Sequence, residues 1–102
     1  MSEPVLSAAD VDAALADQRL SWTRQDNVLV TSVKLRDFVA ALDFVNAVGA
    51  AAEAANHHPD IDIRWNTVRL ALTTHDSGGL TRFDLALAAE IDRLRPAEDS
   101  TS

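Results

Sequence analysis

The chain has 102 residues, of which 47% are hydrophobic and 25% are charged. These values are typical of a globular protein with one domain and one core, and they exclude a chain that is disordered throughout. Sixteen acidic residues against nine basic ones give a net charge of −7, which opposes binding to nucleic acid phosphates. No cysteine is present, which excludes disulfides, thiolate nucleophiles and cysteine-ligated metals.

The first residues lack the basic and apolar regions of a signal peptide, and no uninterrupted apolar stretch reaches the ~18 residues of a membrane span. We therefore expect a cytoplasmic protein that does not enter a membrane. Residues 1–95 are expected to form a single domain. Residues 96–102 are polar and begin with Pro96, so they are predicted to be a disordered C-terminal tail.

The first predicted helix begins after Ser7, a candidate N-cap because Asp10 follows three residues later. Its apolar face is marked by Val11, Ala14 and Leu15. Residues 22–35 then change to the alternating pattern of two strands joined by a turn at Asp26-Asn27. In the second of these strands, Leu29, Val33 and Leu35 are predicted to share the buried side.

A second helix is predicted from about Asp37 to Asn56, and Pro59 cannot continue it. Its predicted apolar stripe consists of Phe38, Ala41, Leu42, Val45, Val48 and Ala52. A second hairpin follows, with Asn66-Thr67 as its predicted turn. The alternating apolar residues of this hairpin are Ile61, Ile63 and Trp65 before the turn and Val68, Leu70 and Leu72 after it.

The third predicted helix begins after Thr81, with Asp84 as the partner residue of a capping box. Phe83, Leu87, Ile91 and Leu94 are its predicted buried face. The resulting order, α-β-β-α-β-β-α, predicts an α+β two-layer sandwich. In this fold the three helices cover one face of a four-stranded antiparallel sheet.

The candidate chemistry centres on three histidines, His57, His58 and His75, each of which follows the predicted end of a helix or strand. Glu53 and Asp84 are nearby candidates for their carboxylate partners. Because histidine changes charge near neutral pH, this pattern favours general acid–base catalysis. Other interpretations remain open: a helix-end cap for His57, a solvated strand end for His75, a helical ion pair for Glu53 and a purely structural cap for Asp84.

Two other kinds of site were weighed against acid–base catalysis. Three histidines with carboxylates could bind zinc or iron, but the chain contains none of the pairs H-x-x-x-H, H-x-H or H-E-x-x-H, and adjacent histidines point apart. The G-x-S-x-G motif of a nucleophilic serine is also missing. We therefore expect neither a metal nor a cofactor.

The pattern E-x3-H-H-P-x5-W-x9-H-x8-D, from Glu53 to Asp84, resembles the pterin-4a-carbinolamine dehydratases. The resemblance covers roughly residues 5 to 95, and the family has the same order of elements. It implies a lyase that removes water from a 4a-hydroxytetrahydropterin and yields a quinonoid dihydropterin, which supports tetrahydropterin recycling. It also implies a homodimer or homotetramer with a pterin substrate and no nucleic acid partner.

The same resemblance implies roles for individual residues. His57 and His75 would be the acid–base pair, and His58 would bind and orient the pterin and share in proton transfer. Glu53 and Asp84 would complete the catalytic group by orienting the imidazoles or stabilising their charged form. The residues implied to border the pterin are Asn56, His57, His58, Trp65, Thr73, Thr74, His75 and Asp76. Some relatives with this fold have lost the histidines and act as assembly chaperones, so the alternative function is a non-catalytic protein-interaction or assembly module.

Overall fold

A computed structural model describes residues 3–96 of the chain. Its elements follow the predicted order α-β-β-α-β-β-α, with one additional short 3-10 helix, η1. The predicted tail lies outside the described residues except for Pro96. The elements are α1 (Ala8–Asp17), β1 (Thr23–Gln25), β2 (Val28–Lys34), α2 (Phe38–Ala55), β3 (Asp60–Arg64), β4 (Thr67–Leu72), η1 (His75–Ser77) and α3 (Arg82–Leu94).

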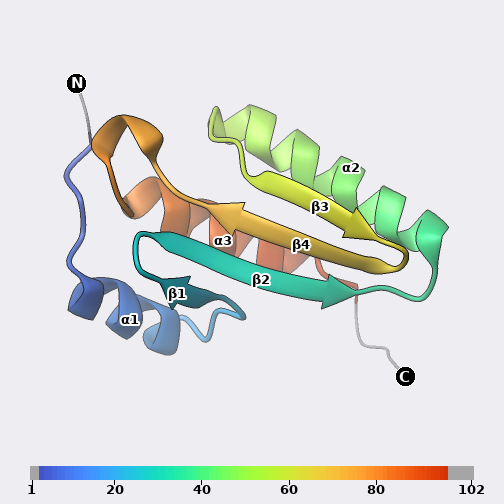
Figure 1. Cartoon of the computed structure of the whole chain (residues 1–102), viewed down its shortest axis with the longest axis horizontal. Helices are drawn as coiled ribbons and strands as arrows, with labels where there is room; N and C mark the ends of the chain where they lie inside the picture. Colours follow the sequence, from blue (N-terminus) through green and yellow to red (C-terminus); the bar gives the residue numbers. More distant parts are fainter. Residues whose placement is uncertain (1–2, 97–102) are drawn as a thin grey trace.

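The four strands form one antiparallel sheet in the order β1-β2-β4-β3, and α2 and α3 lie behind it in the view of Figure 1. The third helix, α1, packs against α3 and β1. Side chains alternate between the two faces of the sheet along each strand. The face beneath the helices carries Leu29, Val68 and Leu72, which are fully buried. The opposite face carries polar side chains, as in the paired row of Ser32, Arg69 and Asp62. The predicted two-layer α+β sandwich is thus confirmed.

The buried face of α2 differs from the predicted stripe. The helix buries Ala41, Phe44, Val48 and Ala52, whereas Phe38 and Leu42 are 44% and 38% exposed. The prediction is right for Ala41, Val48 and Ala52 but missed Phe44, because the helix has apolar residues on most of its circumference. Its periodicity therefore does not identify the face that meets the sheet.

Helix α2 also corrects the expectation about membrane-spanning length. Its 18 residues are long and apolar enough, by length and composition alone, to cross a membrane. Asp43 and Glu53 interrupt the apolar sequence, so counting uninterrupted apolar residues missed it. In the fold this helix packs on α3 and β4.

The turn of the second hairpin lies one residue earlier than predicted, at Trp65-Asn66, because β3 ends at Arg64 and β4 begins at Thr67. Trp65 has a positive φ of 55° and is 66% exposed, so it does not continue the alternation of Ile61 and Ile63. The side chain of Asn66 donates a hydrogen bond to the carbonyl of Leu35, which ties this turn to the end of β2.

The beginning of α3 forms the predicted capping box. The Thr81 hydroxyl accepts from the backbone N–H of Phe83, and the Asp84 carboxylate accepts from the backbone N–H of Thr81. The buried face of the helix consists of Asp84, Leu87, Ala88 and Ile91. The prediction that Phe83 is buried is wrong, since its side chain is 45% exposed. Phe83 lies in the first turn of the helix, next to the histidine that follows α2.

Residues near the two ends of the described chain make specific contacts. Near the N-terminus, Leu6 N–H donates to the Leu80 carbonyl at 2.8 Å, and Glu3 pairs with Arg82 at 2.9 Å. Gly79 allows a close approach here, because a Cβ at this position would lie 2.9 Å from a methyl group of Val5. Residues 3–6 therefore run along the loop between η1 and α3.

At the far end of α3, Asp92 joins three parts of the chain. Its carboxylate accepts hydrogen bonds from Trp22 Nε1 at 3.0 Å, Ser21 N at 2.7 Å and Arg95 Nε at 2.9 Å. Arg95 also donates to the hydroxyl of Thr31 on β2. This network fixes the last turn of α3 against the first hairpin.

Candidate active site

Three segments that are distant in sequence meet at one end of the molecule: the end of α2, the η1 turn after β4, and the beginning of α3 (Figure 1). His57 and His58 directly follow α2, and His75 opens η1. Asp84 lies in the first turn of α3. All of the residues in the predicted site except Trp65 belong to these segments or to the end of β4.

His57 is placed by the way α2 ends. Asn56 caps the helix in the left-handed conformation, with φ 51° and ψ 44°. The N–H of His57 then donates to the Ala52 carbonyl at 3.0 Å, which closes the last turn. Asparagine adopts this conformation more readily than most residues, so the predicted substrate-border residue Asn56 has a clear structural role in the turn.

A buried carboxylate holds the His57 ring. Asp84 Oδ1 lies 2.6 Å from His57 Nε2, with the Asp84 side chain 0% exposed and the His57 side chain 13% exposed. A carboxylate only accepts hydrogen bonds, so Nε2 carries the proton of this contact. Nδ1 is then the nitrogen left for other chemistry, and it has no hydrogen-bond partner within residues 3–96.

The second oxygen of Asp84 is equally well held. Oδ2 accepts from the Thr81 N–H at 2.9 Å and from the Thr74 hydroxyl at 2.7 Å. Since the Thr74 proton goes to Asp84, the contact of 2.8 Å between the two threonine hydroxyls has Thr81 as its donor. Thr81 was predicted only as a helix cap, but it also belongs to the group that fixes Asp84. The capping-box pattern was the sequence feature that pointed to it.

His58 faces a different carboxylate from His57. Its Nε2 lies 2.5 Å from Glu53 Oε2, and the two side chains are 56% and 78% exposed. The expectation that the adjacent histidines point apart is therefore confirmed. An exposed pair of this kind contributes little to stability, so its value lies in orienting the ring.

His75 is exposed at the start of η1, and its side chain forms no hydrogen bond within the described part of the chain. Its neighbour Thr74 binds Asp84, so the backbone next to His75 is tied to the His57 site. On the other side, the Thr73 hydroxyl donates to the Asn27 carbonyl at 2.7 Å. Asp76 is exposed in the same turn. The structure thus places His75 in a turn whose preceding residues are fixed by hydrogen bonds, without direct contact between His75 and the other imidazoles.

Trp65 is not brought to this end of the molecule. The whole of β3 separates it from Pro59, and five residues of strand span about 16 Å. Figure 1 shows the β3–β4 hairpin at the opposite end of the sheet from η1. Its predicted place in the wall of a site with the histidines therefore has no support within a single chain.

Phe83 is the aromatic residue that does lie beside the histidines. Its ring centroid is 6.3 Å from that of His57, with the ring planes inclined at 51°. The Arg82 guanidinium lies over the phenyl ring, 5.3 Å from its centroid. Helical periodicity assigned Phe83 to the same stripe as Leu87, so the sequence alone gave no indication of this position.

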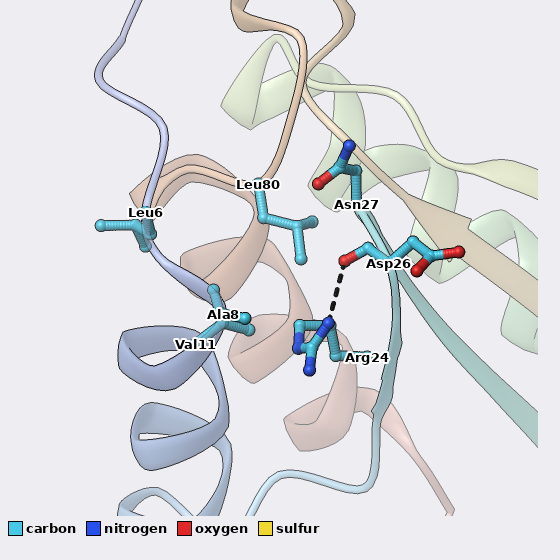
Figure 2. A pocket seen from close by; sticks show the side chains of 7 residues that line it. All are labelled: Leu6, Ala8, Val11, Arg24, Asp26, Asn27 and Leu80. Atoms are coloured by element: carbon cyan, nitrogen blue, oxygen red, sulfur yellow. Dashed lines mark hydrogen bonds between the residues drawn. The ribbon is translucent and has the colours of Figure 1, made fainter.

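A cavity of about 500 Å³ lies behind the loop that joins η1 to α3, between the N-terminal segment and the β1–β2 turn (Figure 2). Arg24 points into it and donates to the Asp26 carbonyl at 3.3 Å. None of the three histidines lines it. Its lining residues are Leu6, Ala8, Val11, Arg24, Asp26, Asn27 and Leu80.

Within residues 3–96, no three histidine, aspartate or glutamate side chains converge as a set of metal ligands. The two short histidine contacts go to separate carboxylates, Asp84 and Glu53. The alternative hypothesis of a zinc or iron site thus finds no ligand set among these residues.

Comparison with known proteins identifies the family. Residues 4–94 match the model of the family described as pterin 4 alpha carbinolamine dehydratase. The chain belongs to this family. A protein of Chloroflexus aurantiacus named "Putative pterin-4-alpha-carbinolamine dehydratase" is 56% identical over 89% of this chain and 97% of its own length. A Mycobacterium bovis protein of the same name is 50% identical over 88% of this chain and 95% of its own length.

Two solved structures of this fold are similar to the chain. One is titled a transcriptional coactivator/pterin dehydratase from Brucella melitensis, with a TM-score of 0.83, 26% identity, and coverage of 90% of this chain and 99% of that one. The other is titled a pterin dehydratase-like RuBisCO assembly factor of the alpha-carboxysome, with a TM-score of 0.62, 20% identity, and coverage of 78% and 92%. The second shows the fold alone. The prediction that the chain is an enzyme, a dehydratase of the hydro-lyase class, is confirmed by the family and its named relatives.

Proposed function

We propose that this dehydratase removes water from a 4a-hydroxytetrahydropterin by general acid–base catalysis, with His57 and His75 as the acid–base pair. The product is a quinonoid dihydropterin, so the reaction supports the recycling of tetrahydropterin. We further propose that the enzyme acts in the cytoplasm as a homodimer or homotetramer. Family membership supports the substrate class, and the chemistry is argued from the residues below.

The observation that carries the proposal is the short contact between buried Asp84 and His57 Nε2, at 2.6 Å. Fixing one ring nitrogen sets the tautomer and direction of the other, which is how carboxylates prepare histidines for proton transfer. Asp84 cannot turn away, because Thr74 and Thr81 occupy its second oxygen. His57 therefore presents Nδ1 in a defined direction, with 13% of its side chain exposed.

The reaction requires two proton movements and no oxidant. One proton goes to the hydroxyl on C4a, because hydroxide is a poor leaving group at neutral pH. The other leaves N5, as the C4a–O bond breaks and the C4a=N5 double bond forms. An acid and a base balance these steps, and exchange with water resets both. Each such group typically contributes about 10²–10⁴-fold to the rate.

The other residues of the proposed site orient the pterin, complete the acid–base pair or border the substrate. His58, paired with Glu53 at 2.5 Å, binds and orients the pterin. His75 completes the pair from a turn that is held on one side by Thr73 and on the other by Thr74. Asn56 and Asp76 border the same region from α2 and η1.

The test is the rate at which an enzymatically generated carbinolamine loses water. We expect the wild-type protein to accelerate this step and the double variant His57→Ala, His75→Ala to return it to the rate in buffer. His58→Ala is the matched histidine control, with a smaller loss that falls mainly on KM. A wild-type protein that gives no acceleration, or a double variant with full activity, contradicts the proposal.

The second candidate is a non-catalytic assembly module, because the similar carboxysomal protein is titled as a RuBisCO assembly factor. The distinguishing feature is the carboxylate-held histidine, for which a scaffold has no use. A stoichiometric protein partner captured by an inactive wild-type protein would favour this second function.

A further inference from the structure

We propose that Phe83 is a substrate-binding residue that forms the apolar wall of the pterin subsite and sets the affinity for the ring system. This inference deepens the proposed function, because it assigns a binding role beside His57 to a residue outside the family pattern. It rests on the dehydratase proposal only for the identity of the substrate.

The position of Phe83 relative to His57 is the first observation. A single exposed apolar side chain is ordinary on a protein surface. This phenyl ring, however, is 45% exposed and lies 6.3 Å from the one imidazole that a buried carboxylate holds. A flat molecule bound against the His57 ring would therefore have this phenyl ring within reach.

The backbone of Phe83 is fixed by the helix cap, and a neighbouring cation lies over its ring. Phe83 is the second residue of α3, and its N–H donates to the Thr81 hydroxyl at 3.2 Å. Arg82 lies over the ring at 5.3 Å and is itself paired with Glu3 at 2.9 Å. A phenylalanine has only two side-chain torsions, so it loses little conformational entropy when a ligand packs on its ring.

The chemistry of the substrate matches such a wall. The pyrimidinone half of a tetrahydropterin is flat and conjugated, and aromatic side chains bind flat heterocycles by stacking or edge contacts. Contacts of this kind are worth about tenfold in affinity. The phenyl ring takes no proton, so its removal should act on binding and leave the proton transfers intact.

The experiment compares Phe83→Ala with Phe83→Tyr and with a matched control, Phe38→Ala. Phe38 is 44% exposed at the beginning of α2, and the length of that 18-residue helix separates it from His57. We expect Phe83→Ala to raise KM for the carbinolamine about tenfold and to change kcat less than about threefold. In Phe83→Tyr, KM and kcat should stay within about twofold of the wild-type values. In Phe38→Ala, both should equal the wild-type values.

Binding provides a readout that does not depend on turnover. The dissociation constant of 7,8-dihydrobiopterin, measured by calorimetry, should rise about tenfold in Phe83→Ala and remain unchanged in Phe38→Ala. An unchanged dissociation constant in Phe83→Ala overturns the inference even if the wild-type protein is an active dehydratase. A wild-type protein that binds the dihydropterin through Phe83 but fails to dehydrate the carbinolamine would instead overturn the proposed function.

Two further outcomes would assign Phe83 another role. A loss of kcat at constant KM would mean that the phenyl ring positions His57. A change in the mass of Phe83→Ala by light scattering would mean that the ring packs between subunits. Either result overturns the binding role, and an unchanged melting temperature in all variants excludes misfolding as the cause.

Discussion

Asp84 combines two functions through its two oxygens. Oδ2 completes the capping box with Thr81, and Oδ1 holds His57. The sequence predicted both roles, because a capping-box acid and a family-pattern acid coincide at this position, but it did not specify which imidazole Asp84 would hold. It did not indicate that the Thr74 hydroxyl would be the third donor, since that contact depends on how η1 packs against α3.

Asp84→Asn is the sharpest test of this residue. An asparagine amide can donate to His57 Nε2, which would move the ring proton to Nδ1 and remove the lone pair proposed to face the substrate. We expect kcat for dehydration to fall about 100-fold, with a smaller change in KM. The measurement is steady-state kinetics with a melting curve for each variant.

Asp92→Asn is the matched control for that variant. Asp92 lies on the same helix, is 16% exposed, and accepts hydrogen bonds from Trp22, Ser21 and Arg95. Weakening these contacts should cost about 1–3 kcal/mol of unfolding free energy and leave kcat unchanged. If both variants lost activity in proportion to stability, Asp84 would have no specific catalytic role.

The positions of two aromatic residues, Phe83 and Trp65, could not be predicted from the sequence. Phe83 shares the helical stripe of Leu87 but lies in the first turn of α3, where its side chain is 45% exposed although the next residue, Asp84, is fully buried. Trp65 fits the alternation of β3 but occupies the turn. Apolar character predicts burial only where a second element covers the residue, and local sequence does not say where the covering ends.

At the scale of elements, the connection from α2 to the site depends on Asn56, whose backbone is in the left-handed conformation. The sequence predicted that α2 runs to about Asn56, because Pro59 cannot continue a helix, and the helix ends at Ala55 with Asn56 as its cap. It also predicted both hairpins, with the second turn displaced by one residue. The face of α2 was harder to predict, because Phe38, Leu42 and Phe44 all fit an apolar helix and only packing distinguishes them.

Substitutions of Asn56 should separate backbone conformation from side-chain chemistry. Asn56→Gly keeps the left-handed conformation available and should change stability by only a few tenths of a kcal/mol. Asn56→Val should cost about 1–2 kcal/mol, because a β-branched residue is strained at a φ of 51°. Urea unfolding measures both values.

Activity should follow the same order if Asn56 acts through its backbone. Asn56→Gly should then retain kcat and KM close to wild type. A large rise in KM in Asn56→Gly, without loss of stability, would show instead that the amide side chain contacts the pterin.

At the scale of the whole molecule, the acidic chain still contains ion pairs that respond to pH. Arg24 donates to both oxygens of Asp12, at 2.9 and 3.1 Å. This hydrogen bonding holds the pKa of Asp12 below its ordinary value of 3.8. The pair links α1 to β1, beside the cavity of Figure 2.

The sign of the pH dependence follows from that lowered pKa. The contribution of Asp12 is fully present above the pKa of the unfolded chain and is lost as the pH falls through the lower, folded value. The stability difference between wild type and Asp12→Asn should therefore be constant above about pH 5 and shrink below about pH 4. Urea unfolding across this range measures it, and a difference independent of pH would contradict the assignment.

Self-association is the other prediction at this scale. Two apolar side chains in the first turns of α2 are largely exposed, namely Val39 and Leu42 at 64% and 38%. β3 also lies at an edge of the sheet, with an unpaired side available. We expect light scattering to give the mass of a dimer or tetramer, and Val39→Glu with Leu42→Glu to shift it towards a monomer. A monomeric wild-type protein would contradict this expectation.

The contacts of residues 3–6 have a practical consequence for experiments on this enzyme. These residues lie along the loop between η1 and α3, and Glu3 pairs with Arg82, so a peptide fused ahead of residue 3 would begin close to the start of α3. The last turn of α3 lies at the other end of the fold (Figure 1). Affinity tags and fluorescent labels for kinetic or calorimetric work are therefore better attached after α3 than ahead of residue 3.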